Sequence, residues 1–143
     1  ISCITDCPYD GPTNPAEVIK VGEELLDMGC YEISLGDTLG SATPETTQKL
    51  LSALSSAFKT KDLALHFHDT KGRAIENINI SLDFGISTFD SSIAGLGGCP
   101  YAPGAKGNVS TESVIEFLES KGLRTGVDIE KIKEAAEFSR SLR

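Results

Sequence analysis

Four short, apolar, β-prone segments recur along the chain, and a helical pattern separates each from the next. They are centred near residues 3, 33, 65 and 89, so that successive segments lie about 24 to 32 residues apart. This interval is the length of one β-strand followed by one α-helix, the unit that connects parallel strands. The segments also carry apolar residues on both faces, as buried parallel strands do. The pattern predicts an α/β protein with a parallel sheet.

Local signals set the bounds of the expected elements. The pairs Asn14-Pro15 and Thr43-Pro44 are each typical of a helix N-cap followed by proline in the first turn, and Asp128 is a further candidate N-cap. Strands are expected over 1–4, 31–35, 63–68 and 86–92, and helices over 15–28, 44–58, 74–84, 110–121 and 129–142. In the second helix, the apolar positions expected to face the core are Leu50, Leu51, Leu54 and Phe58.

Two architectures fit this order of elements: an open doubly wound sheet and part of a (β/α)8 barrel. A complete barrel needs about 200 residues or more, whereas this chain has 143. Residues 1–143 are therefore expected to form one partial TIM-barrel domain of about four βα units plus a C-terminal helix. The chain begins abruptly in a strand-like segment, which favours a fragment.

Composition excludes several classes of protein. The net charge of −8 and the pI near 4.7 leave no broad basic face for nucleic acid or an anionic membrane. No apolar run approaches the ~20 residues of a membrane-spanning helix, and no targeting segment is recognisable. The four cysteines form no CxxC pair, so they are interpreted as reduced thiols of an intracellular protein, with Cys30 expected to be a small buried side chain.

Polar residues gather where the expected strands end. Asp37 closes the second strand, His68-Asp69 the third, and Asp90 the fourth. In parallel α/β folds, the carboxyl ends of the strands and the loops after them hold the functional sites. The sequence therefore predicts a site on this rim.

The only two histidines, His66 and His68, lie two residues apart in the third strand. Side chains at i and i+2 project from the same face, so both imidazoles point together while Phe67 faces the helices. The pair favours a divalent metal site, and oxygen co-ligands would favour Mg²⁺ or Mn²⁺ over a thiolate zinc site. The alternative is a pair of surface or packing histidines.

A loop over 94–108 contains five glycines. It has neither the Walker P-loop spacing nor that of a dinucleotide site. Gly97 and Gly98 precede Cys99, and such glycines let backbone approach a ligand closely. One interpretation is a loop that delivers a reactive Cys99 thiol over the site, and the other is a flexible linker.

Taken together, these motifs resemble the C-terminal half of the 3-hydroxy-3-methylglutaryl-CoA lyase family, which belongs to the metal-dependent TIM-barrel lyases and Claisen-type synthases. The similarity runs over nearly the whole chain and is most specific at the Gly-Gly-Cys-Pro-Tyr run. The matching stretches are 29–38, 66–70, 92–101 and Gly107-Asn108, with Glu112 four residues on.

The resemblance implies cleavage of 3-hydroxy-3-methylglutaryl-CoA to acetyl-CoA and acetoacetate. It makes His66, His68 and Asn108 the metal ligands and Cys99 the loop thiol that acts as catalytic acid or base. It also makes Asp37 an active-site aspartate, gives His66 a second role in proton transfer, and makes Glu112 a supporting residue. The implied partners are an acyl-CoA substrate, Mg²⁺ or Mn²⁺, and a second copy of the chain in a homodimer.

The resemblance also raises expectations about the whole protein. The family's Arg-Asp pair at the end of the first barrel strand, where the Asp is a metal ligand, falls outside a chain that starts near the fifth strand. A polypeptide of these 143 residues alone is therefore expected to bind metal weakly and to turn over poorly. The compartment would be the cytoplasm in a bacterium and the mitochondrial matrix in a eukaryote. The alternatives are a related Claisen-type synthase or metal aldolase, and a non-catalytic half barrel that pairs with itself.

Overall fold

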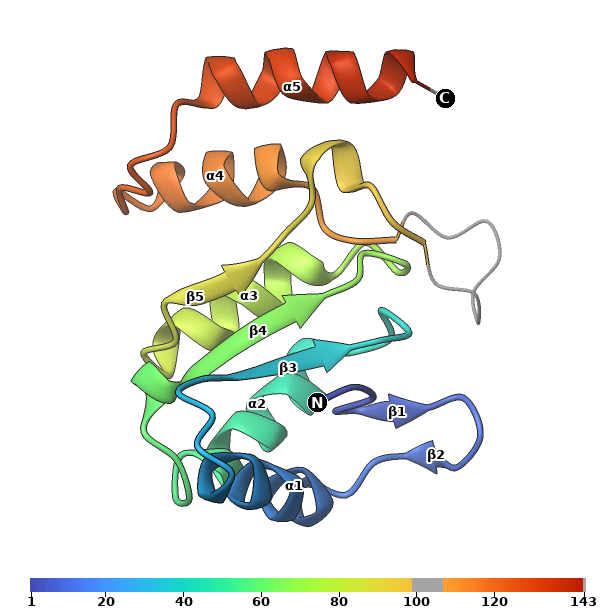
Figure 1. Ribbon diagram of the computed structural model, residues 1–143, viewed down its shortest axis with the longest axis vertical. Coiled ribbons are helices and arrows are strands. Elements are labelled where there is room, and N and C mark those ends of the chain that lie inside the picture. The colour runs from blue at the N-terminus through green and yellow to red at the C-terminus, as the bar shows by residue number, and fades with distance from the viewer. Residues whose placement is uncertain (99–106, 143) are drawn as a thin grey trace.

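The computed structural model describes residues 1–98 and 107–142 and has the expected alternation of strands and helices (Figure 1). A parallel sheet is formed by β3 (Ile33–Asp37), β4 (Leu63–Phe67) and β5 (Thr88–Asp90), in that order. The helices are α1 (Pro15–Asp27), α2 (Pro44–Leu54), α3 (Ala74–Asp83), α4 (Thr111–Ser120) and α5 (Ile129–Ser141). Two short 3₁₀ turns, η1 (Thr60–Asp62) and η2 (Ile93–Gly95), precede β4 and follow β5.

The predicted helix starts are confirmed. Asn14 and Thr43 cap α1 and α2 through side-chain oxygens, and proline follows each of them in the first turn. Asp128 caps α5 in the same way, accepting from two backbone N–H groups. These side chains satisfy N–H groups that have no partner inside the helix, so each helix begins where its cap lies.

The register of the sheet separates its two faces. Leu35 pairs with Leu65, and Leu65 with Phe89. These positions face the helices, and Leu35 and Leu65 are both buried. On the opposite face Gly36 pairs with His66, and His66 with Asp90. One face of the sheet is therefore apolar, and the other is polar and partly open to solvent.

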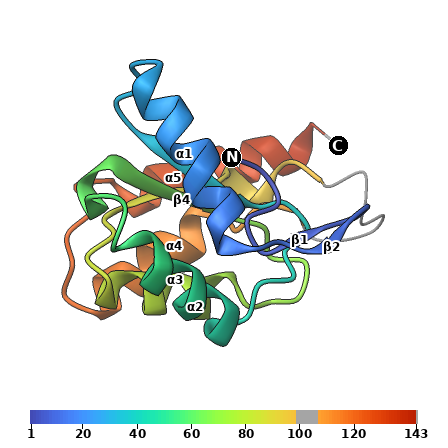
Figure 2. The same cartoon turned by 90° about the horizontal axis from the view of Figure 1, so that it is seen from below.

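Each helix packs against the next in chain order; α2 and α3 lie behind the sheet, whereas α5 lies on α4 and η2 (Figures 1 and 2). The core between them and the strands is formed by fully buried aliphatic side chains, among them Leu54 of α2, Leu65 of β4 and Ile78 of α3. The predicted buried positions Leu50, Leu51 and Leu54 of the second helix are confirmed. Phe58 is buried as well, but it follows the end of α2 at Leu54, so the predicted helix over 44–58 is too long. The predicted orientation of Phe67 toward the helices is confirmed as well.

The segment expected to form the first strand is not a strand. Ile1 and Ile4 are each hydrogen-bonded to Gly36 of β3, but Cys3 between them has φ 58°, in the left-handed region. Its N–H turns away and donates to Thr38 Oγ1. The segment therefore follows the edge of β3 without forming a regular ladder, because one residue departs from extended geometry.

Two further local features differ from expectation. A small antiparallel hairpin, β1 (Asp6–Cys7) with β2 (Gly11–Pro12), occupies a stretch predicted only to break the first strand. Cys30 is exposed rather than buried, because the chain turns at Gly29 after α1 and reaches β3 only at Ile33. Cys3, Cys7 and Cys30 are all free thiols, as predicted.

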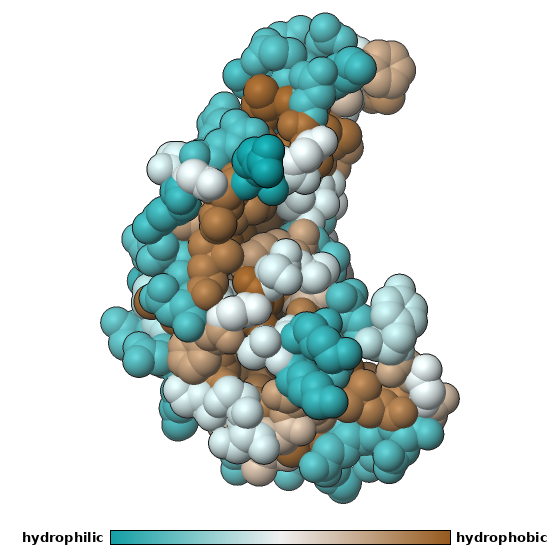
Figure 3. All heavy atoms as spheres, turned by 90° about the vertical axis from the view of Figure 1, so that its left-hand side faces the viewer, coloured by the Kyte–Doolittle hydropathy of each residue, from teal (hydrophilic) through white to brown (hydrophobic). Residues whose placement is uncertain are grey.

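β5 pairs only with β4 among the residues that the structure describes, so its other edge has no strand partner there. Beside it, a pocket of about 480 Å³ lies between α3, β5 and α4 and is lined mainly by apolar side chains, including Leu82, Phe89 and Leu118. Apolar side chains also gather in a band on the side of the molecule drawn in Figure 3. Within the described part of the chain, no helix has the length and apolar character needed to cross a bilayer.

Candidate metal centre

The end of β4 meets the segment that leads into α4. His68 and Asn108 are directly opposed in an isolated antiparallel bridge. Asp69 donates to Gly107 O at 2.7 Å, and Val109 donates to Phe67 O at 3.2 Å, so backbone hydrogen bonds flank the pair on both sides. Opposed residues of this kind have the shorter Cα separation and the closer side chains of the two antiparallel pair types. The backbone therefore brings the imidazole of His68 next to the amide of Asn108.

Both side chains of this pair have a buried polar atom without a hydrogen-bond partner. These atoms are Nδ1 of His68 and Oδ1 of Asn108. Buried polar atoms normally have partners, so two neighbouring exceptions require an explanation such as a bound ion. An imidazole nitrogen and an amide oxygen are both ligands that divalent cations accept. The donor set at this rim therefore fits a cation.

His66 contributes a second imidazole on the same side of the strand. The His66 and His68 ring centroids are 5.2 Å apart, which confirms that the two side chains project together. Nδ1 of His66 lies 3.7 Å from Asp90 Oδ2 on β5. That same carboxylate oxygen accepts a hydrogen bond of 2.7 Å from Ser34 Oγ on β3. Side chains from all three parallel strands are thus linked across the open face.

The environment of His68 favours its uncharged form. Burial lowers the pKa of the His68 imidazole, and the neighbouring His66 lowers it further. A neutral imidazole has a free ring nitrogen, which is the form that binds a metal ion. The electrostatics of the site therefore agree with the unpartnered Nδ1.

Asp37, at the end of β3, has a different environment. Its side chain is 2% exposed and faces the helix side of the sheet. Oδ2 accepts from Ala42 N at 3.0 Å, and Oδ1 accepts from Ser41 N at 3.2 Å and from Thr5 Oγ1 at 3.5 Å. Burial raises the pKa of this carboxyl, and the hydrogen bonds from Ala42 and Ser41 offset part of that effect. The structure thus places Asp37 in the turn between β3 and α2.

The two ends of the glycine-rich loop meet at the site. Asn108 N donates to Gly97 O, and its amide Nδ2 donates to Leu96 O at 2.8 Å. Gly107 has φ +79°, and a Cβ there would overlap the carbonyl oxygen of Gly97. Only glycine allows this close approach. The hydrogen bond from Nδ2 to Leu96 O then orients the amide of Asn108, and its Oδ1 has no hydrogen-bond partner. The described part of the loop stops at Gly98 and resumes at Gly107, so Cys99 lies outside the described residues.

Glu112, in the first turn of α4, holds the other side of this loop. Its Oε2 accepts from Ala94 N at 2.9 Å, and its Oε1 lies 3.2 Å from Arg140 Nη2 of α5. Glu112 therefore supports the backbone that leads to Leu96 and Asn108, through its contacts with Ala94 and Arg140.

Within residues 1–98 and 107–142, no three His, Cys, Asp or Glu side chains come together as a cation site. The candidate set is therefore two imidazoles and one amide oxygen. Sequence reasoning did not single out Ser34 or Arg140 as neighbours of the site. Alternation along the strand could have placed Ser34 on the face of His66, but only with the register known.

Parallel βα units with polar side chains gathered at the carboxyl ends of the strands are typical of α/β barrel proteins. A family model described as HMGL-like matches residues 1–138. The chain belongs to this HMGL-like family, which is metal-dependent. The family resemblance inferred from the motifs is thereby confirmed.

Individual relatives of the chain point to the same family. The chain is 52% identical over 138 residues to the mitochondrial hydroxymethylglutaryl-CoA lyase of Arabidopsis thaliana. The aligned part is 96% of this chain and 30% of that protein. It matches the crystal structure of the HMG-CoA lyase from Brucella melitensis with a TM-score of 0.97 and 49% identity, over 99% of this chain and 50% of that one. A lyase from Acinetobacter baumannii, in complex with coenzyme A and 3-methylmalate, matches with a TM-score of 0.90 and 33% identity, over 99% of this chain and 46% of that one.

These matches settle the fold class. The chain spans 30% to 42% of the length of the curated relatives and about half of the matched lyase structures. It has the fold of half of an HMG-CoA lyase TIM barrel, which confirms the predicted α/β class and decides against the open doubly wound sheet.

Proposed function

We propose that this chain carries the metal-binding and loop half of a carbon–carbon lyase that cleaves 3-hydroxy-3-methylglutaryl-CoA to acetyl-CoA and acetoacetate. The observation that carries the proposal is the pair of buried, unpartnered atoms, His68 Nδ1 and Asn108 Oδ1, set side by side on the rim. Membership of a metal-dependent family supports a cation at that point. The proposed ligands are His66, His68 and Asn108, and the proposed cation is Mg²⁺ or Mn²⁺.

The chemistry begins with a proton on a tertiary alcohol whose pKa is far too high for a free side chain to remove. A divalent cation held by these residues would lower that pKa. We assign His66 to the cation and to proton transfer in turn: when its ring lone pair is not on the cation, that nitrogen accepts the proton of the alcohol. Nδ1 of His66 lies 3.7 Å from Asp90 Oδ2, so this carboxylate faces the ring that takes part in the transfer.

The remaining steps place the proton and the electrons of the broken bond. As the alcohol oxygen becomes the ketone oxygen of acetoacetate, the C–C bond breaks and its electron pair forms the enolate of acetyl-CoA. We assign the S–H of Cys99 as the acid that protonates the enolate carbon. Gly97 and Gly98 would let the backbone of this loop come close to the substrate and exclude water. A catalytic role for Asp37 stays a prediction of the family resemblance.

The test is cleavage of 3-hydroxy-3-methylglutaryl-CoA by the natural full-length protein, rather than by these 143 residues alone, with Mn²⁺ or Mg²⁺ and with a chelator. We expect acetoacetate and acetyl-CoA in equal amounts with metal, and no turnover with chelator. Cys99→Ala should lower kcat by roughly 10²–10⁴-fold, the contribution of a positioned proton donor. Full activity of Cys99→Ala would favour a related Claisen-type synthase or metal aldolase instead.

Assembly and compartment belong to the same proposal. We propose a homodimer with an acyl-CoA substrate, in the mitochondrial matrix if the source is a eukaryote and in the cytoplasm if it is a bacterium. One relative named above is mitochondrial and another was solved with coenzyme A, which supports these assignments. Analytical ultracentrifugation of the protein as encoded tests the dimer, and a single species with the mass of one chain would contradict it.

A further inference from the structure

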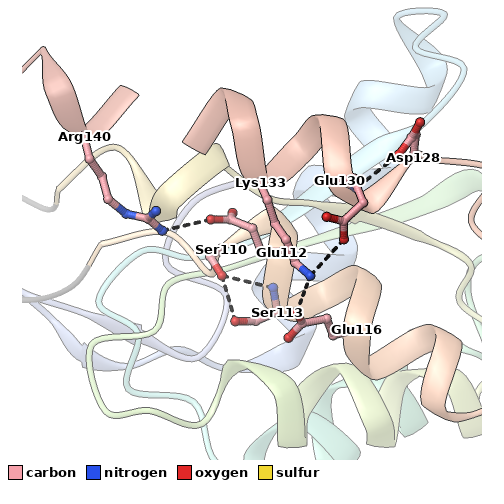
Figure 4. A network of polar contacts seen from close by, with 8 residues as sticks. All are labelled: Ser110, Glu112, Ser113, Glu116, Asp128, Glu130, Lys133 and Arg140. Atoms are coloured by element: carbon pink, nitrogen blue, oxygen red, sulfur yellow. Dashed lines mark hydrogen bonds and ion pairs between the residues drawn. The ribbon is translucent and has the colours of Figure 1, made fainter. Parts of the chain in front are cut away.

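The last helix of the chain reaches back to the candidate metal centre through one ion pair. Arg140 of α5 and Glu112 of α4 are joined between Nη2 and Oε1 at 3.2 Å, and Figure 4 shows the guanidinium directed at the carboxylate. The side chain of Glu112 is 14% exposed, whereas that of Arg140 is 61% exposed. A largely buried carboxylate needs a partner to offset its lost hydration. Arg140 provides that partner from the solvent side.

The second oxygen of Glu112 acts on the loop. Oε2 accepts from the N–H of Ala94 at 2.9 Å. Ala94 has φ 55°, a left-handed conformation that a residue with a Cβ adopts only when the surroundings impose it. Glu112 thus links α5 to the one non-glycine residue of η2 whose backbone is strained. Other contacts hold the same turn, including Ser92 N to Val109 O and Thr111 N to Ser92 O.

Two residues beyond Ala94, the loop contacts a proposed ligand. Leu96 N donates to Ile93 O and closes the turn, and Leu96 O accepts from the amide Nδ2 of Asn108 at 2.8 Å. That hydrogen bond decides which way the amide of Asn108 points and so where its unpartnered Oδ1 lies. A continuous path runs from Arg140 through Glu112, Ala94 and Leu96 to the amide oxygen.

We infer that Arg140 is a positioning residue for the metal centre: it neutralises Glu112, which holds the turn at Ala94 that orients Asn108. The inference rests on the proposed function in taking Asn108 as a metal ligand. Groups that support a metal ligand from outside typically change metal affinity by about 10–100-fold. Arg140 contacts Glu112 rather than Asn108 itself, and its side chain is more than half exposed. We therefore expect its loss to change the Mn²⁺ affinity by about 3- to 10-fold.

The chain offers a matched control on the same helix. Lys133 of α5 also pairs with a carboxylate of α4, Glu116, at 3.9 Å, and with Glu130 at 3.2 Å, and it does not contact Glu112 (Figure 4). Lys133→Ala therefore weakens the docking of α5 on α4 without disturbing the path to Asn108. Arg140→Lys retains the charge and serves as the rescue variant.

The experiment measures two quantities in the protein as encoded: the Kd of Mn²⁺, from free Mn²⁺ by electron paramagnetic resonance, and hydrogen exchange of a peptide covering 92–96. Arg140→Ala should raise the Kd about 3- to 10-fold and speed exchange at Ala94. Lys133→Ala should do neither, and Arg140→Lys should recover most of the Mn²⁺ affinity.

Two outcomes would overturn the inference. One is unchanged exchange over 92–96 in Arg140→Ala, whatever happens to the metal. The other is an equal rise in Kd for Arg140→Ala and Lys133→Ala, which would mean that only helix docking matters. If the unmodified protein itself binds no Mn²⁺, the proposed function fails, and the exchange data still report separately on the path from Arg140 to Ala94.

Discussion

Two neighbouring parallel strands end in polar residues, and the two ends differ in whether the hydrogen-bonding capacity of those residues is used. At the end of β3, both carboxylate oxygens of Asp37 accept hydrogen bonds, two of them from backbone N–H groups. At the end of β4, His68 Nδ1 and Asn108 Oδ1 are buried without partners. Burial favours the neutral form at both places, raising the pKa of Asp37 and lowering that of His68.

This contrast separates a residue whose hydrogen-bonding capacity is used by the fold from residues whose capacity is free for a proposed ligand. A satisfied buried carboxylate stabilises the turn around it, and removing it leaves N–H groups unpaired. An unsatisfied buried acceptor costs stability, so two such atoms side by side call for an explanation such as a bound ion. Asp37 and His68 both lie at strand ends, so position along the strand does not distinguish them; the face of the sheet and the number of hydrogen bonds do.

The largest effect is expected for His68→Ala. Removing a proposed imidazole ligand should weaken Mn²⁺ binding by at least about 100-fold, since mutating residues that only hydrogen-bond to a metal ligand already lowers metal affinity by about 10–100-fold. The free energy of unfolding without metal should change by less than about 1 kcal/mol through hydrogen bonding, because the deleted Nδ1 has no partner. Mn²⁺ titration and urea unfolding measure the two quantities. An unchanged Kd would remove His68 from the site.

Asp37→Ala should show the opposite profile. It leaves the N–H groups of Ser41 and Ala42 without their acceptor, so the free energy of unfolding should fall by about 2–4 kcal/mol. The affinity for Mn²⁺ should change little. Loss of turnover with stability unchanged would contradict this and would instead support the catalytic role that the family resemblance gives to Asp37.

The pH dependence of Asp37→Asn sharpens the same point. Because burial raises the pKa of Asp37 above 3.8, the folded protein holds the proton more tightly than the unfolded chain does. The stabilisation from protonation is therefore present below 3.8 and is lost as the pH rises through the folded pKa. The stability deficit of Asp37→Asn should therefore shrink as the pH rises from below 3.8 through the raised pKa of the folded state. Urea unfolding at several pH values measures it, and a growing deficit would mean that the hydrogen bonds outweigh burial.

The smallest effect is expected for Ser34→Ala, on the open face of β3. It removes one hydrogen bond to Asp90, so stability should fall by only about 0.5–1.5 kcal/mol. The freed carboxylate should also shift the pH profile of the proposed lyase reaction, because Asp90 faces His66. The matched control is Ser120→Ala, whose hydroxyl bonds only within its own helix. Identical pH profiles for the two variants would show that Ser34 has no link to the site.

Much of the fold was predictable because its signals are local. Caps at Asn14, Thr43 and Asp128 act within one helical turn, and apolar periodicity reports directly on which side of an element is buried. The strand at 1–4 was mispredicted for the opposite reason. Its composition is β-prone, but the left-handed Cys3 depends on a hydrogen bond to Thr38, which is distant in sequence.

The sequence by itself determined the parallel βα order, the helix starts and the projection of His66 and His68 from one side of a strand, because each depends on spacings of a few residues. Only the tertiary structure decided that Asp37 is saturated by the turn after β3, that Asn108 lies opposite His68, and that Arg140 reaches Glu112. These facts depend on strand register and on chain segments meeting across the fold. A polar residue has the same local pattern whether its partner is a backbone amide, a cation or a helix from the far end of the chain.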